Sequence, residues 1–297
     1  MDHNLLRAGD IINNEVIKMK KIAAGQITDV VKSLCIEANC FLPRDVRNVL
    51  DSAKSAETWP AACGVLDDII ENYHRAEALD MPICQDTGTA CVFVELGQEV
   101  YVEGSITDAI NEGVRRGYIE GYLRKSIVAD PLARQNTRDN TPAVITYDVV
   151  PGDSLTITVA PKGAGSENMG RLAMLKPSDG VAGIKDFVLE TVQKAGPNPC
   201  PPIVVGVGIG GNFDRVAQLA KKALLRPLGA EHPDPRYAAL ERELLQSINA
   251  LGIGPQGFGG RTTALGVHIE AFPTHIAQLP CAVNINCHVT RHKTAVL

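Results

Sequence analysis

Apolar positions recur with a helical period early in the chain, and the pattern shortens to strand-like runs after residue 84. Positions 43–53 carry an apolar stripe, and Val65, Ile69, Ile70 and Tyr73 follow at helical spacing, so two helices are predicted. Short strands are predicted over 90–96, 143–149 and 155–160, with an amphipathic helix over 106–122.

The second half of the chain mixes the two patterns. Helices are predicted over 184–192, 213–225 and 237–251, and strands over 203–207, 263–269 and 282–285. A proline-rich connection covers 226–235, and neither an internal repeat nor a long polar linker interrupts the pattern. We therefore expect an α+β fold, with a helical N-terminal lobe and mixed sheets flanked by helices, as one domain over 1–297.

Composition narrows the class of partner. The chain has 297 residues, of which 45% are hydrophobic and 21% charged, values typical of a globular protein. Its 29 basic and 34 acidic residues give a net charge of -5, which provides no electrostatic footprint for nucleic acid or for an anionic membrane. A small-molecule ligand is the better expectation.

The N-terminal residues argue against export. Asp2, Arg7, Asp10 and Glu15 leave no room for the apolar core of a signal peptide, and no apolar run approaches the length of a membrane span. We expect a cytosolic protein, in which cysteines stay reduced and serve metals or catalysis rather than disulfides. The chain's eight cysteines then require an explanation.

A glycine motif offers one competing interpretation. Gly206, Gly208 and Gly211 follow the apolar run 203–205 with the spacing of a dinucleotide-binding turn, which would indicate a nicotinamide-dependent dehydrogenase. That fingerprint also needs a second strand about 20 residues later, and the prolines and glycine of 226–233 make a poor central strand. We favour glycines that let the backbone approach a neighbour closely.

Three cysteines stand in loop-like settings rich in glycine or proline: Cys84, Cys200 and Cys287. Pro201 is expected to hold Cys200 extended. Three thiolates would leave one iron of a cluster open, although scattered cysteines are also common as small buried hydrophobes, and spacing alone leaves both alternatives standing. No C-x-x-C pair supports a zinc or redox motif. Burial suits the settings of Cys35, Cys63 and Cys91, whereas Cys40 is undecided.

Several motifs in order resemble one family. They are Cys84-Gln-Asp-Thr-Gly88, Lys162-Gly-Ala-Gly-Ser166, Cys200-Pro-Pro202 with Gly206 to Gly211, and His275 twelve residues before Cys287. Together they resemble the class I fumarases over most of the chain, most closely the alpha subunit of the two-subunit form. The alpha subunit of tartrate dehydratase shares the cluster motifs.

The resemblance implies a site and a partner. Cys84, Cys200 and Cys287 would hold a four-iron four-sulfur (4Fe-4S) cluster whose fourth iron binds substrate. Gln85, Asp86, Arg124 and Gly165 would contact the substrate, and His275 would take part in proton transfer together with Asp86. A separate beta subunit, in a heterotetramer, would complete the site. The segment 163–168 looks like the fumarase version of the substrate loop, which favours fumarate and malate over the tartrate alternative.

The proposed residues also have plainer interpretations. Asp86 is two residues from Cys84 and can reach the same cavity, where we expect it to pair with His275, with Arg124 as the cation for a developing carboxylate charge. Asp86 alone would equally suit an Asx-turn, and His275 a surface loop. Ala164 and Arg138 stand where glycine is expected from the resemblance. Beside a hydro-lyase and a nicotinamide-dependent dehydrogenase, a non-catalytic iron–sulfur scaffold is the third class of function that the sequence leaves open.

Overall fold

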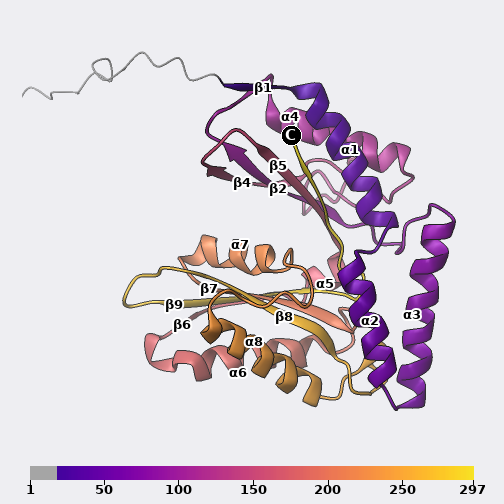
Figure 1. Ribbon diagram of the computed structural model, residues 1–297, viewed down its shortest axis with the longest axis vertical. Helices are drawn as coiled ribbons and strands as arrows, with labels where there is room; N and C mark the ends of the chain where they lie inside the picture. Colours follow the sequence, from indigo (N-terminus) through magenta and orange to yellow (C-terminus); the bar gives the residue numbers. More distant parts are fainter. Residues whose placement is uncertain (1–18) are drawn as a thin grey trace, which may run out of the picture.

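The computed structural model describes residues 19–297, and within that range two four-stranded sheets form two lobes joined side by side (Figure 1). The N-terminal residues whose charges argued against a signal peptide lie outside the described range. No helix among residues 19–297 is both long and apolar enough to cross a membrane.

The first lobe is built on a sheet that gathers strands from distant parts of the chain. Its order is β10-β5-β2-β4, with β2 parallel to β4 and antiparallel to β5. Two helices, α1 (Ala24–Cys40) and α4 (Ile106–Glu120), pack against each other and cover one face. A parallel pair, β1 (Lys20–Ala23) and β3 (Val100–Glu103), lies beside them. The sheet strands are β2 (Thr89–Gly97), β4 (Val144–Val150), β5 (Leu155–Lys162) and β10 (Lys293–Val296).

The second lobe has three layers. Its sheet has the order β6-β9-β7-β8, with β7 parallel to β8 and antiparallel to β9. Helices α6 (Gly180–Ala195) and α8 (Pro235–Ala250) cover one face, and α7 (Phe213–Ala223) covers the other (Figure 1). The strands are β6 (Arg171–Leu175), β7 (Ile203–Gly210), β8 (Ala264–Phe272) and β9 (Leu279–Asn286).

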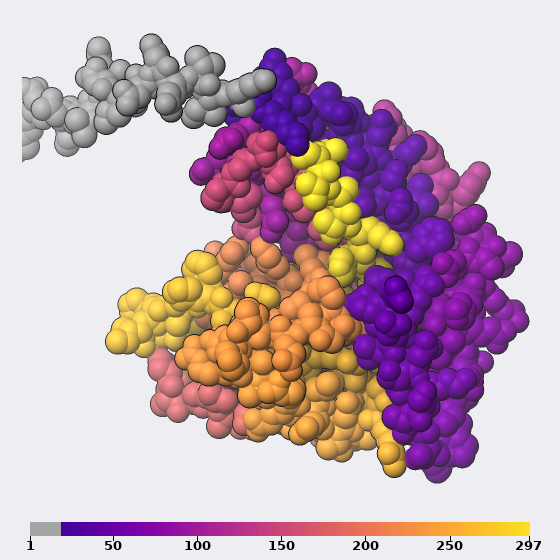
Figure 2. All heavy atoms as spheres, in the orientation of Figure 1, coloured from indigo at the N-terminus to yellow at the C-terminus, as the bar shows by residue number. Residues whose placement is uncertain are grey.

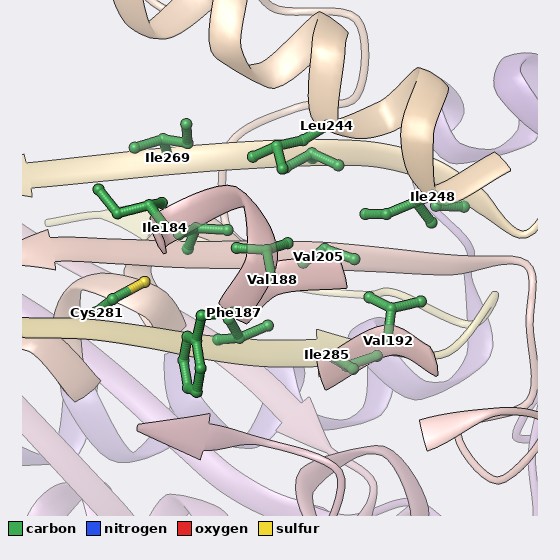
Figure 3. Close-up of a cluster of buried hydrophobic side chains, with 14 of the residues drawn as sticks. Ile184, Phe187, Val188, Val192, Val205, Leu244, Ile248, Ile269, Cys281 and Ile285 are labelled. Carbon is green, nitrogen blue, oxygen red and sulfur yellow. The ribbon is translucent and has the colours of Figure 1, made fainter. Parts of the chain in front are cut away.

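The core of this lobe follows from the alternation along β7. Ile203, Val205, Val207 and Ile209 point to the side of α6 and α8, where they join a buried apolar cluster that also includes Leu244 (Figure 3). Burying each such side chain stabilises the fold by roughly 1.5–3 kcal/mol.

Glycines occupy the opposite face of β7. A Cβ added at Gly206 would lie 2.2 Å from the Ala220 carbonyl oxygen, and one at Gly208 would lie 2.2 Å from that of Val216. Only glycine lets α7 approach the strand this closely. The interpretation of these glycines as a close-packing device is therefore confirmed, and the closely approaching neighbour is helix α7.

Helices α2 (Arg44–Ala56) and α3 (Pro60–Ala78) form a pair along the side of the second lobe (Figure 1). Their apolar residues join a buried cluster with Val204, Leu265 and Val289. The chain that leaves α3 reaches Cys84, so this pair anchors the first of the three predicted cysteine ligands.

The predicted helices and strands are confirmed, with shifts of a few residues at their ends. Helix α1 was missed, although its buried residues, among them Ile27, Val31, Leu34 and Ala38, recur at helical spacing. The short strands β1, β3, β6 and β10 and the one-turn helix α5 (Ala164–Glu167) were also missed. The α+β class is confirmed; a single domain over 1–297 stays a prediction.

Candidate functional site

The three predicted cysteine ligands come together. Cys84, Cys200 and Cys287 line one cavity of about 80 Å³, although they lie on three separate loops. Cys84 follows α3, Cys200 precedes β7, and Cys287 comes directly after β9. Burial raises the pKa of both Cys200 and Cys287, and a charge on Cys84 raises both pKa values further.

Cys200 is held in a tight turn rather than in the extended conformation that we expected. Its φ is +56°, and its amide donates to the Pro197 carbonyl at 3.0 Å. The Cys200 carbonyl accepts a hydrogen bond from the His288 amide at 3.4 Å and lies 2.9 Å from His288 Nδ1. These bonds outweigh the local preference that Pro201 imposes, and they fasten Cys200 to the residue beside Cys287.

Asp86 joins the Cys84 loop to helix α5. One carboxylate oxygen accepts from the Gly88 amide at 3.0 Å, which makes an Asx-turn, and the other accepts from the Ala164 amide at 2.8 Å. The Asp86 amide itself lies 3.4 Å from Cys84 Sγ. Asp86 also lines the cavity, so its turn-forming role does not remove it from the candidate site.

The buried side chain of Lys162 holds helix α5 in position by hydrogen bonds. Lys162 is 6% exposed, and its ammonium donates to Ser166 Oγ and to the Ile285 carbonyl, both at 2.7 Å. Burial lowers the pKa of Lys162, and Glu167 at 3.4 Å opposes that shift. This network, whose function the sequence did not indicate, places Gly165 at the cavity.

The predicted Gly165 has space on its open side. A Cβ there would meet only the Asn198 carbonyl oxygen, at an ordinary contact distance of 3.6 Å. Packing within the chain therefore does not require glycine at this position. A ligand that approaches the backbone closely would require it.

Gln85 and Arg124 lie near the cavity but do not line it. Gln85 is exposed next to Cys84, and Arg124 is exposed on a segment whose carbonyl accepts a 3.1 Å hydrogen bond from Thr87 Oγ1. That bond ties the Arg124 segment to the Cys84 loop. Their roles in substrate binding stay predictions.

His275 is not brought to this cavity within the chain. It is exposed in the loop before β9, whereas Cys287 follows the other end of that strand, which spans roughly 24 Å at about 3.4 Å per residue. The expected pairing of His275 with Asp86 is wrong: the Asp86 carboxylate accepts main-chain amides, and His275 Nδ1 accepts from the Ala277 amide at 3.2 Å. A role in proton transfer stays a prediction.

Arg291 is a residue that the sequence did not single out. It is 4% exposed, lines the cysteine cavity, and donates from Nη2 to the Asp86 carbonyl at 2.6 Å. The sequence could have indicated Arg291 by its position four residues after Cys287, because a residue so close along the chain to a predicted ligand can reach the same cavity.

The remaining cysteines are mostly core residues. Cys35 and Cys91 are buried as expected, and burial raises the pKa of Cys35 to about 12. Cys40, which the sequence left undecided, is buried too, and Cys63 is half-buried on α3. Cys281, whose role the sequence did not address, is buried, and its pKa is raised to about 12 by burial.

The donor set suits a cluster better than a single ion. Among residues 19–297, no group of three or more histidine, cysteine, aspartate or glutamate side chains is arranged to hold one metal ion. In an iron–sulfur cluster each thiolate binds a different iron, so the sulfurs surround a volume instead of meeting at a point. Three thiols around one cavity fit that requirement.

A larger cleft of about 480 Å³ opens between the two lobes, where Figure 2 shows the surface hollowed. Its charged lining includes Glu167 and Lys221, which pair with each other, and Asn284 donates to Glu167 at 2.9 Å. Asn284 Oδ1 has no hydrogen-bond partner among the described residues. The cysteine cavity is still the stronger candidate for chemistry, because the three predicted ligands line it.

Comparison with known proteins agrees with the motifs. The sequence model of the family described as fumarate hydratase (fumerase) matches residues 28–296. A Methanocaldococcus jannaschii protein named "Putative L(+)-tartrate dehydratase subunit alpha" is 47% identical over 273 residues, covering 90% of this chain and 95% of that protein. The L(+)-tartrate dehydratase subunit alpha of Escherichia coli O157:H7 is 35% identical over 282 residues, covering 94% and 93%.

Proposed function

Because this chain belongs to the fumarate hydratase family, we propose that it is the alpha subunit of a hydro-lyase that dehydrates L(+)-tartrate. The observation that carries the hydro-lyase assignment is the cavity shared by Cys84, Cys200 and Cys287. Tartrate takes precedence over fumarate, reversing the order that the sequence favoured, because the similar proteins named above are tartrate dehydratase alpha subunits. A cytosolic location belongs to the same proposal.

The proposed reaction removes water across two neighbouring carbons. The hydroxyl leaves from one carbon and the proton from the other, and the enol that tartrate yields then isomerises to oxaloacetate. A 4Fe-4S cluster held by the three cysteines would supply an iron without a protein ligand, a Lewis acid that polarises the departing hydroxyl.

Residues of this chain would bind the substrate and accept a proton from it. Each Asp86 carboxylate oxygen accepts one amide hydrogen bond and keeps a further lone pair, so the group can still accept a proton at the cavity. Gly165 lies in the first turn of α5, where main-chain amides lack intrahelical partners and can donate to a carboxylate. Gln85 and Arg124 would bind the substrate at the edge of the cysteine cavity.

A beta subunit is part of the proposal. The relatives are named as alpha subunits, and a dicarboxylate needs several converging cations or hydrogen-bond donors. Arg124 is exposed outside the cavity, and one nitrogen of Arg291 is already bonded to Asp86. A second chain over the cavity would supply the remaining groups, consistent with a heterotetramer.

Anaerobic turnover tests this proposal. The chain, co-expressed with its candidate beta subunit, should convert L(+)-tartrate to oxaloacetate with a kcat/KM at least about tenfold above that for fumarate or malate, equivalent to about 1.4 kcal/mol of discrimination. The alpha chain alone serves as the control and should be inactive. A kcat/KM that favours fumarate would reassign the substrate.

Fumarate remains the second candidate, supported by the resemblance of segment 163–168 to the fumarase substrate loop and by the description of the matching family. A dehydrogenase is disfavoured, because Gly206 and Gly208 are occupied in packing against α7. A cluster-loaded complex that turns over none of the tested substrates would instead favour a non-catalytic scaffold.

A further inference from the structure

Arg291 carries a buried charge that forms no ion pair with the side chains of residues 19–297. The side chain is 4% exposed, and its Nε and Nη1 atoms have no hydrogen-bond partner among the described residues. Nη2 donates to a neutral carbonyl, that of Asp86. A buried guanidinium with two unpaired donors is costly, which indicates that an acceptor absent from the polypeptide satisfies it.

The position of Arg291 identifies that acceptor. Arg291 lines the same cavity as the three cysteines and Asp86. The Asp86 carboxylate accepts the amides of Gly88 and Ala164 rather than the guanidinium, which leaves the thiolates and the sulfides of a bound cluster as the acceptors there. The bond to the Asp86 carbonyl fixes the guanidinium beside the Cys84 loop.

We propose that Arg291 donates hydrogen bonds to the sulfur atoms of the cluster held by Cys84, Cys200 and Cys287, and that its charge sets the reduction potential of that cluster. The inference rests on the proposed function, since it requires the cluster. Net charge and hydrogen bonds to sulfur are among the factors that set the potential of iron–sulfur centres. A fixed cation stabilises the more negative, reduced state and therefore raises the potential.

Arg291 would then be a positioning residue whose action is electrostatic. A purely structural role, holding the Asp86 loop through its carbonyl, would leave the potential unchanged as long as the cluster binds. Two variants separate these roles. Arg291→Gln keeps amide donors but removes the charge, and Arg291→Lys keeps the charge with altered geometry.

The experiment is an anaerobic redox titration of the reconstituted complex, followed by the spectrum of the reduced cluster. In Arg291→Gln we expect the one-electron equilibrium to shift at least tenfold against reduction, which corresponds to a potential about 59 mV lower. Arg291→Lys should shift less than half as far. Arg116→Gln, which changes a half-buried arginine on α4 that does not line the cysteine cavity, is the matched control and should keep the wild-type potential.

The outcomes distinguish this inference from the proposed function. Wild-type protein without iron and sulfide refutes the cluster and, with it, the proposed function. A wild-type cluster whose potential is unchanged in Arg291→Gln refutes the role of Arg291 and leaves the proposed function standing. If Arg291→Gln does not fold, Arg291→Lys decides: a shift of tenfold or more despite the retained charge would refute the electrostatic role.

Discussion

Replacing Asp86 with asparagine separates the chemistry of the site from its architecture. The carboxylate accepts the Gly88 amide at 3.0 Å on one oxygen and the Ala164 amide at 2.8 Å on the other. Asparagine has a single acceptor oxygen, so one of these two amides would face an NH₂ group. The substitution also removes the group proposed to accept a proton.

The structural cost of this change can be worked out from those two bonds. An unsatisfied donor costs about 1–3 kcal/mol, and the lower half of that range applies because Asp86 is only half-buried. A loss of about 1–2 kcal/mol lowers the melting temperature by only several degrees in a protein of this size. Loss of proton transfer should lower kcat by about 10² or more, corresponding to about 2.7 kcal/mol.

Iron content, melting temperature and kcat of the Asp86→Asn complex are the required measurements. We expect near wild-type iron, a small loss of stability and a large loss of turnover. Asp179→Asn is the control, because the Asp179 carboxylate also accepts a main-chain amide, that of Lys176 at 2.8 Å, but does not line the cavity. Wild-type kcat in Asp86→Asn with full iron content would refute the role of Asp86.

Three further predictions address packing, pH and the outlying histidine. Gly206→Ala should lower the free energy of unfolding by about 1–3 kcal/mol in denaturant, since the added Cβ would meet the Ala220 carbonyl. Gly64→Ala, whose Cβ would have no atom within 4 Å, is the control and should be neutral or stabilising. Equal changes in the free energy of unfolding for the two variants would contradict the packing argument. Burial, aided by Arg226, lowers the pKa of His268 from 6.5 to about 4, so the unfolded state binds the extra proton and stability falls as the pH drops from 6.5 towards 4. Between pH 7 and about pH 4.5 this loss is about 2 kcal/mol, and His268→Gln should show an acid-induced loss smaller by that amount; an unchanged loss would contradict it. His275→Asn should leave iron content unchanged, because the residue lies at the far end of β9, and a measured loss of iron would contradict that placement.

The sequence predicted which cysteines come together better than it predicted the geometry around them. Cysteines in glycine and proline settings, taken with the motif order, selected three residues that the fold places around one cavity. The backbone of Cys200 could not be anticipated, because its positive φ depends on hydrogen bonds to His288, which is distant in sequence. Local rules such as the effect of Pro201 describe a preference that such long-range bonds override.

Contacts of charged residues with residues far away in the sequence could not be predicted from the sequence either. Arg291 has no motif of its own, and its importance follows from burial and from a bond to a loop that lies 205 residues earlier. His275 failed to meet Asp86 because strand β9 separates it from Cys287, and a strand prediction that began at residue 282 did not show how far the strand extends. Arg138 does adopt the glycine-like backbone that was expected for its position, with φ of +69°.

The most direct test of the account is the iron and sulfide content of anaerobically reconstituted cysteine variants. Wild-type protein and the Cys63→Ser control should each carry about four irons per chain, whereas Cys84→Ser, Cys200→Ser and Cys287→Ser should each lose the cluster, because a hydroxyl is a poor ligand for it. Full iron content in any one of these three variants would contradict the three-thiolate site.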